Sequence, residues 1–192
     1  MTRIAILFSG RGSNMQALAE HIARPDIDAA FVLGLTNRPN AKGLEYCASI
    51  GVDAHAIDHK AYESRAAFDA ELDKALRAAN IDLICCAGFM RLLTAEFVDG
   101  WRDRIINIHP SLLPKHKGLH THARAIEAGD SEAGCSVHYM RPEMDEGPVI
   151  VQRRVPILDG DTPETLAARV LVEEHIAYPE ALDSVLKKMA GT

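Results

Sequence analysis

Short apolar runs alternate with amphipathic stretches through the first half of the chain. Strand-length apolar runs cover residues 3–8, 29–37, 55–57 and 82–87, and the stretches between them, 15–23, 41–50 and 65–79, have helical periodicity. This alternation is typical of a mainly parallel sheet with helices on both faces. The run 82–87 is almost entirely apolar, which predicts a central strand buried on both sides.

The second half of the chain is less regular. We expect a short helix over 94–98, a strand over 104–109 and, after the prolines at 110 and 114, a helix over 123–128. Residues 136–140 and 149–155 predict two strands, and the short loop between them favours antiparallel pairing. Helices are predicted over 166–175 and 179–189, and the second begins at Pro179. The expected fold is therefore a Rossmann-like α/β domain with an antiparallel extension in its C-terminal half.

Composition narrows the class of protein. A chain of 192 residues with 47% hydrophobic content fits one domain over residues 1–192. Its net charge of -6 argues against a nucleic-acid partner, and its N-terminal apolar run of five residues, 4–8, is too short for a membrane segment or a signal peptide. The four cysteines lack metal-type or redox-type spacing, which favours buried thiols and a cytoplasmic location.

A glycine-rich loop, SGRGSN over residues 9–14, follows the first predicted strand and opens a helix. Backbone N–H groups at such a helix start bind phosphate or carboxylate. The third glycine and the ribose-binding acidic residue of dinucleotide sites are missing, so the loop predicts a monophosphate site, with a purely structural turn as the alternative. Ser13 is also a candidate N-cap for the helix.

Asn107, His109 and Asp145 form the candidate catalytic group. Asn107 and His109 are two residues apart on a predicted strand, so their side chains project from one face, and Pro110 favours a strand end with an exposed imidazole. Asp145 falls in the loop 141–148. An amide, an imidazole and a carboxylate suit acyl-type transfer without a covalent enzyme intermediate. The alternative is that His109 is an ordinary polar residue at a strand end.

The whole chain resembles the phosphoribosylglycinamide formyltransferase family. The resemblance rests on the strings SGRGSN (9–14), ESRAAFD (63–69), AGFMRLL (87–93), NIHPSLLP (107–114), GLHTH (118–122), MDEGPVI (144–150) and EEHIAYP (173–179). It implies transfer of a formyl group from the co-substrate 10-formyltetrahydrofolate to the amine of glycinamide ribonucleotide. It also implies phosphate binding in the N-terminal half and catalysis and folate binding in the C-terminal half.

The same resemblance assigns roles to individual residues. The resemblance implies that the substrate phosphate binds at Gly12, Ser13 and Asn14 and that the ribose binds at Glu174. It implies that the folate contacts Arg65, Met90, Arg91, Leu92, Leu93 and Asn107. The catalytic group that it implies is Asn107, His109 and Asp145. Leu171 departs from the family pattern, where a polar residue often contacts the ribonucleotide. Core packing is the alternative role for Met90, Leu92 and Leu93.

The expected chemistry follows from charge. Attack of an amine on the formyl carbon places negative charge on the formyl oxygen, which N–H groups of Asn107 and His109 would stabilise. A carboxylate at Asp145 favours the protonated form of His109. We expect no metal, because the histidines at 109, 116, 120 and 122 lack metal-ligand spacing. His120 and His122 are expected to form loop hydrogen bonds, and the bond Leu113–Pro114 is expected to be cis.

Three other functions compete with this interpretation. A 10-formyltetrahydrofolate hydrolase would use water as acceptor, but its relatives carry an additional N-terminal domain, whereas the glycine loop here starts within ten residues of Met1. A methionyl-tRNA formyltransferase is disfavoured by the acidic charge and by the expected absence of a C-terminal RNA-binding domain. A non-catalytic folate or nucleotide sensor would not need Asp145. The sequence leaves a monomer and a homodimer both open.

Overall fold

The computed structural model describes residues 1–191. They divide into two compact units, the first covering Met1–Ile106 and the second beginning at Asn107. The division falls inside strand β5 (Ile105–His109), so this strand contributes residues to both units.

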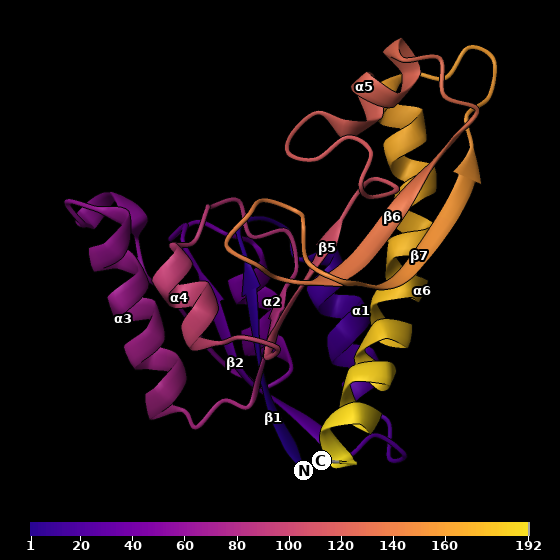
Figure 1. Ribbon diagram of the computed structural model, residues 1–192. Coiled ribbons are helices and arrows are strands. Elements are labelled where there is room, and N and C mark those ends of the chain that lie inside the picture. Colours follow the sequence, from indigo (N-terminus) through magenta and orange to yellow (C-terminus); the bar gives the residue numbers. More distant parts are fainter. Residues whose placement is uncertain (192) are drawn as a thin grey trace. The chain divides into compact units, whose positions relative to one another are not determined.

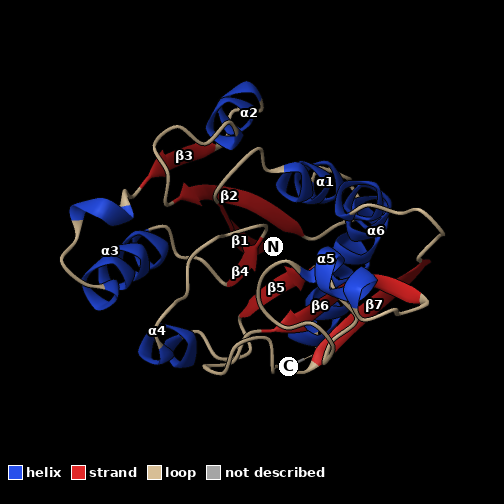
Figure 2. Cartoon of the chain, turned by 90° about the horizontal axis from the view of Figure 1, so that it is seen from above, coloured by secondary structure: helices blue, strands red, loops and turns tan. Residues whose placement is uncertain are grey.

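The first unit alternates strands and helices, as the hydrophobic pattern predicts. Its elements are β1 (Thr2–Phe8), α1 (Ser13–Ile22), β2 (Ala29–Thr36), α2 (Gly43–Ser49), β3 (Asp53–Ala56), the 3-10 turn η1 (His59–Ala61), α3 (Arg65–Ala78), β4 (Leu83–Cys86) and α4 (Ala95–Gly100). The strand order is β3-β2-β1-β4, and the pairings of β1 with β2 and β4 and of β2 with β3 are parallel. Figure 2 shows α1 and α2 on one face of these strands and α3 and α4 on the other.

The core of the first unit is built around β1 and β4. Ile4, Leu7 and Phe8 of β1 are fully buried, and all four residues of β4, LICC, are buried beside β1. Complete burial of a side chain of this size contributes about 1.5–3 kcal/mol. The prediction that 82–87 contains a central strand is confirmed, and the two cysteines of β4 are buried thiols, one of which, Cys86, has its pKa raised by burial to about 12.

The second unit consists of the end of β5, helix α5 (Thr121–Glu127), strands β6 (Glu132–Tyr139) and β7 (Val149–Pro156), and the long helix α6 (Pro163–Ala190). Its strand order is β5-β6-β7, and β6 and β7 pair in antiparallel fashion, as expected. Helix α6 packs along β6 and β7, which Figure 1 shows in orange beside the yellow helix. The expected α/β class with an antiparallel extension is confirmed.

The prediction of two separate C-terminal helices is wrong. Helix α6 continues through Pro179, although proline removes one backbone hydrogen bond and its ring crowds the preceding turn. The buried residues of α6 lie on both sides of the proline, among them Val170, Tyr178 and Val185, and they keep helical spacing throughout. Burial of one continuous apolar stripe therefore outweighs the local cost of the proline.

Among residues 1–191, no helix has the length and apolar character needed to cross a membrane.

Candidate active site

The glycine loop between β1 and α1 has a left-handed backbone conformation at Gly12. Gly12 precedes α1 with φ of 76°, a backbone conformation that favours glycine. The amide of Gly43 donates to the Gly10 carbonyl and fixes the loop. The N-cap assignment of Ser13 is wrong, because Ser13 is the first helical residue and no side chain caps α1.

Ser9 joins this loop to the segment that follows β4. Its buried hydroxyl donates to Asn37 Oδ1 at 2.5 Å and accepts the backbone N–H of Met90 at 2.7 Å. His59 Nδ1 lies 2.8 Å from the Asn37 carbonyl and adds a third side chain to the network. The Ser9 hydroxyl thus connects the start of the glycine loop to Met90, one of the candidate folate residues.

The candidate folate residues of the first unit lie largely at its surface. Met90 and Leu92 are 62% and 53% exposed, so the alternative that they belong to the core is wrong. The guanidinium of Arg91 stacks over the Phe68 ring at 4.8 Å. Arg65, the first residue of α3, is also exposed. Exposed apolar side chains beside a fixed cation suit the wall of a ligand site.

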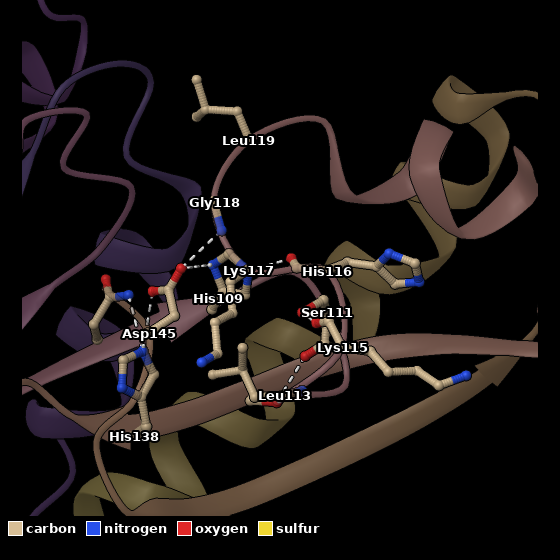
Figure 3. Close-up of polar contacts among 12 residues, drawn as sticks. His109, Ser111, Leu113, Lys115, His116, Lys117, Gly118, Leu119, His138 and Asp145 are labelled. Atoms are coloured by element: carbon tan, nitrogen blue, oxygen red, sulfur yellow. Dashed lines mark hydrogen bonds and ion pairs between the residues drawn. The ribbon is translucent and has the colours of Figure 1, made fainter. Parts of the chain in front are cut away.

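The candidate catalytic residues begin at the end of β5. Asn107 is partly buried, and His109 is only 6% exposed, so the expected exposed imidazole is wrong. Residues 115–118 lie beside the His109 ring, and the His116 carbonyl contacts its Nε2 (Figure 3). A buried imidazole forms its hydrogen bonds with protein groups and not with bulk water.

Asp145 is held between two histidines. Its Oδ2 lies 3.5 Å from His109 Nδ1 and accepts the backbone N–H of Gly118 at 2.9 Å, while its Oδ1 lies 3.6 Å from His138 Nε2. Figure 3 shows the carboxylate with His138 on one side and with His109 and Gly118 on the other. The backbone of Asp145 has φ of 55°, a left-handed conformation that few residues other than glycine adopt readily. The structure thus brings Asp145 to His109, as the sequence-based hypothesis requires.

The other ring nitrogen of His109 has a backbone partner. Nε2 lies 3.0 Å from the carbonyl oxygen of His116 and must donate to it, because a carbonyl only accepts. The His116 ring in turn contacts Asp130 at 2.7 Å, and Lys115 contacts the same carboxylate at 2.8 Å. These partners, His116 first, hold the pKa of Asp130 below its ordinary value. The loop that contacts the His109 imidazole is therefore anchored by charged side chains.

A second set of hydrogen bonds fixes the start of this loop to β6 and β7. The Ser136 hydroxyl donates to the Ser111 carbonyl and accepts the N–H of Leu113, and the Gln152 amide donates to the Leu113 carbonyl. The bond Leu113–Pro114 is cis, as predicted. Ser136 and Gln152 were not among the predicted site residues. A polar residue in an otherwise apolar strand was the available signal for Ser136.

His138, also on β6, is a functional candidate at a position where the sequence favours a structural role on a strand near the site. It is 2% exposed, its Nδ1 lies 3.0 Å from the Tyr139 carbonyl, and its Nε2 lies 3.3 Å from Asn107 Nδ2. Burial lowers the pKa of His138, against smaller raising effects from the Tyr139 carbonyl and Asp145. The signal available in the sequence was its two-residue spacing from Ser136, which places two polar side chains on one face of an apolar strand.

The remaining predicted residues have simple positions. Glu174 is a buried residue of α6, and Leu171 is a partly exposed neighbour in the same helix. His122 is partly buried, its Nε2 has no hydrogen-bond partner among the described residues, and burial lowers its pKa, so the expected loop hydrogen bond is not present at that atom. Within residues 1–191 there is no group of three or more His, Cys, Asp or Glu side chains placed to hold a metal ion.

Comparison with known proteins places this arrangement in a family. A family model described as formyl transferase matches residues 2–182. The chain belongs to the formyl transferase family. Both the glycine loop and the Asn107, His109 and Asp145 group fall inside the matched range.

Curated members of the formyl transferase family differ in length. The chain is 48% identical over 182 residues to the trifunctional purine biosynthetic protein adenosine-3 of Drosophila pseudoobscura pseudoobscura, with 94% of this chain and 13% of that protein covered. It is 43% identical over 176 residues to the phosphoribosylglycinamide formyltransferase of Escherichia coli (strain K12), with 92% and 83% covered. The chain therefore spans a small part of the long relatives and most of the short one.

Solved formyl transferase structures have the same fold. The glycinamide ribonucleotide transformylase 1 of Symbiobacterium toebii has a TM-score of 0.95 and 44% identity, with 98% of this chain and 89% of that chain covered. The phosphoribosylglycinamide formyltransferase of Brucella melitensis has a TM-score of 0.91 and 44% identity, with 96% and 95% covered.

Proposed function

We propose that this chain transfers the formyl group of 10-formyltetrahydrofolate to the amine of glycinamide ribonucleotide, as a phosphoribosylglycinamide formyltransferase. The observation that carries the proposal is the position of the Asp145 carboxylate beside the buried ring of His109, in a chain of the formyl transferase family. The close relatives that bear this enzyme's name support the choice of substrates.

The reaction needs charge stabilisation and proton transfer. The substrate amine attacks the formyl carbon, and negative charge develops on the formyl oxygen. Collapse of this intermediate breaks the carbon–nitrogen bond to the folate, whose nitrogen takes a proton while the new amide nitrogen loses one. Donors fixed in place before the reaction stabilise the developing oxyanion without reorganising during the step.

His109 and Asp145 supply the protonated donor in this proposal. The carboxylate lies 3.5 Å from Nδ1, so its negative charge faces the ring. The proton on Nε2 points at the His116 carbonyl, and the formyl oxygen therefore shares this proton or replaces that carbonyl as its acceptor. Asn107 supplies a neutral amide N–H to the same oxygen.

Substrate binding is assigned to residues of the glycine loop, of α3, of the segment after β4, of β5 and of α6. The loop Gly12, Ser13 and Asn14 at the start of α1 holds the phosphate, because its N–H groups and the helix dipole favour an anion. The Glu174 carboxylate accepts hydrogen bonds from the ribose hydroxyl groups. The folate contacts Arg65, Met90, Arg91, Leu92, Leu93 and Asn107.

A coupled assay with purified protein tests the proposal. Tetrahydrofolate should form from 10-formyltetrahydrofolate only when glycinamide ribonucleotide is present, with one formylated amine produced for each folate consumed. Equal tetrahydrofolate formation with formate release in the absence of the amine would identify a hydrolase. Binding of either ligand without turnover would identify a sensor, and both outcomes would contradict the transferase.

A further inference from the structure

His138 has contacts that define its protonation pattern. The side chain is buried on β6, and three groups surround its ring nitrogens: the Tyr139 carbonyl near Nδ1, and Asn107 Nδ2 and Asp145 Oδ1 near Nε2. A carbonyl oxygen only accepts, so Nδ1 carries the proton. Burial favours the neutral ring, which leaves a lone pair on Nε2.

This tautomer decides which way the Asn107 amide faces. A lone pair at Nε2 accepts and does not donate, so the Asn107 atom at 3.3 Å must be the NH2 nitrogen and not the carbonyl oxygen. The amide of Asn107 has two N–H bonds. One is directed at His138, and the other is left to point elsewhere in the plane of the amide.

We propose that His138 is a positioning residue that fixes the Asn107 amide with its nitrogen, rather than its oxygen, presented to the formyl oxygen. This inference rests on the proposed formyl transfer and adds a residue to it. Rotation of the amide by half a turn would place a carbonyl oxygen against the developing oxyanion, and the interaction would change from attraction to repulsion. The Nε2 lone pair of His138 opposes this rotation because it has no proton to offer a carbonyl.

The effect of removing His138 should appear in turnover and not in binding. His138→Leu fills the buried space with an apolar side chain but removes the hydrogen-bond acceptor, so the Asn107 amide samples both orientations. We expect kcat to fall by about tenfold to a hundredfold, which is no more than the usual cost of removing an oxyanion donor. Both KM values should stay within about twofold of those of the unaltered protein. His138→Gln, whose side-chain oxygen can accept the same N–H, should recover most of this loss.

A double-mutant cycle with Asn107→Ala separates positioning from general damage to the fold. If His138 acts through Asn107, His138→Leu causes no further loss of kcat in the Asn107→Ala background. Val137→Ala is the matched control, because Val137 is a buried neighbour on the same strand with no polar contact at the site, and its effect should multiply with that of Asn107→Ala. Multiplicative losses for His138→Leu, or a loss expressed in KM, would overturn the proposal.

The tautomer can be measured without substrate. In the ¹⁵N spectrum of the intact protein labelled at histidine, His138 should show a protonated Nδ1 and an unprotonated Nε2 at neutral pH. A protonated Nε2 refutes the role of His138 even if the enzyme is active. Absence of amine-dependent turnover in the unaltered protein refutes the proposed function instead, so the two failures are distinguishable.

Discussion

The Nε2–H of His109 is directed at the backbone carbonyl of His116, 3.0 Å away. The orientation of the His109 imidazole therefore depends on a loop residue seven positions later in the chain. The His116 side chain contacts the Asp130 carboxylate, and this contact holds the His116 backbone carbonyl in place. The position of His109 is a property of the folded loop and not of β5 alone.

Replacement of His109 by alanine should reduce kcat by about a hundredfold to a thousandfold, the usual cost of removing one oxyanion donor. The KM for the folate should change little, because the imidazole is proposed to act only as charge develops. Steady-state kinetics at saturating ribonucleotide measure both constants. His55→Ala, at an exposed histidine of β3, is the control and should keep full activity. Near-normal turnover of His109→Ala would remove His109 from the mechanism.

A carboxylate introduced at Gly10 should weaken binding of the ribonucleotide. Gly10 is the better position for this test than Gly12, since a Cβ there meets no atom within 4 Å and Gly10 has no positive φ. Unit charges about 4 Å apart repel by ~1 to 4 kcal/mol near a protein surface, so Gly10→Asp should raise the KM for the ribonucleotide by about tenfold or more. Gly10→Asn, of equal size without the charge, should leave it nearly unchanged. Equal KM values in the two variants would contradict the phosphate assignment.

The stability of the protein should fall as the pH falls below about 6.5, in part because of His138. Burial holds the folded pKa of His138 below its ordinary value of 6.5, so the unfolded chain binds more protons in this range. The stabilisation is complete above the unfolded pKa and is lost progressively as the pH falls to the folded pKa. Asp145, His109 and Asn107 face the ring, and of these Asp145 opposes the shift and His109 adds to it. Urea unfolding at several pH values from about 8 to 5 measures the slope.

The matched variant for this measurement is His138→Gln, which does not titrate. Its slope of unfolding free energy against pH should be shallower than that of the unaltered chain. The slope that remains should include His122, whose pKa is also lowered by burial. Identical slopes in the two proteins would show that His138 does not titrate between its folded and unfolded states.

Asp161 should contribute to the stability of the N-terminal end of α6. Its carboxylate accepts from both terminal nitrogens of Arg169 and from the Leu158 backbone N–H, and these contacts, Arg169 first, hold its pKa far below the ordinary value of 3.8. Asp161→Asn should lower the urea midpoint at neutral pH, and the difference should vanish in acid as the pH falls through the folded pKa. Asp159→Asn, at an exposed neighbouring position, should have no effect. A midpoint unchanged by Asp161→Asn would show that the ion pair adds nothing measurable.

The alternation of elements could be predicted because burial acts on local patterns. The continuous apolar run around Leu83–Cys86 predicted a buried strand, and the short connection after Tyr139 predicted an antiparallel pair. The break expected at Pro179 did not occur, since the preference of one residue was overridden by the buried stripe that runs along a helix of 28 residues. At the start of α6, Thr162 and Thr165 form the capping box, and Asp161 binds Arg169.

The site could be predicted only in part. The two-residue spacing of Asn107 and His109 gave their common face, but no local pattern predicts that a loop encloses the imidazole and buries it. The partners of His109 and Asp145 include the His116 carbonyl and the Gly118 N–H, and backbone groups leave no signature in side-chain identities. His138 was missed as a partner of Asn107 because a histidine in a strand is usually structural.

At Asp145 the left-handed backbone conformation favours glycine, whereas the proposed reaction needs a carboxylate. At φ of 55° a glycine has no Cβ to hinder this conformation, which costs most L-residues about 1–2 kcal/mol and aspartate less, yet it would remove the carboxylate beside His109. A library screened for thermal resistance alone should therefore enrich Asp145→Gly among its survivors, and the same library screened for growth without purines should lose it. Residue 145 is a position at which selection for durability and selection for catalysis lead to different amino acids.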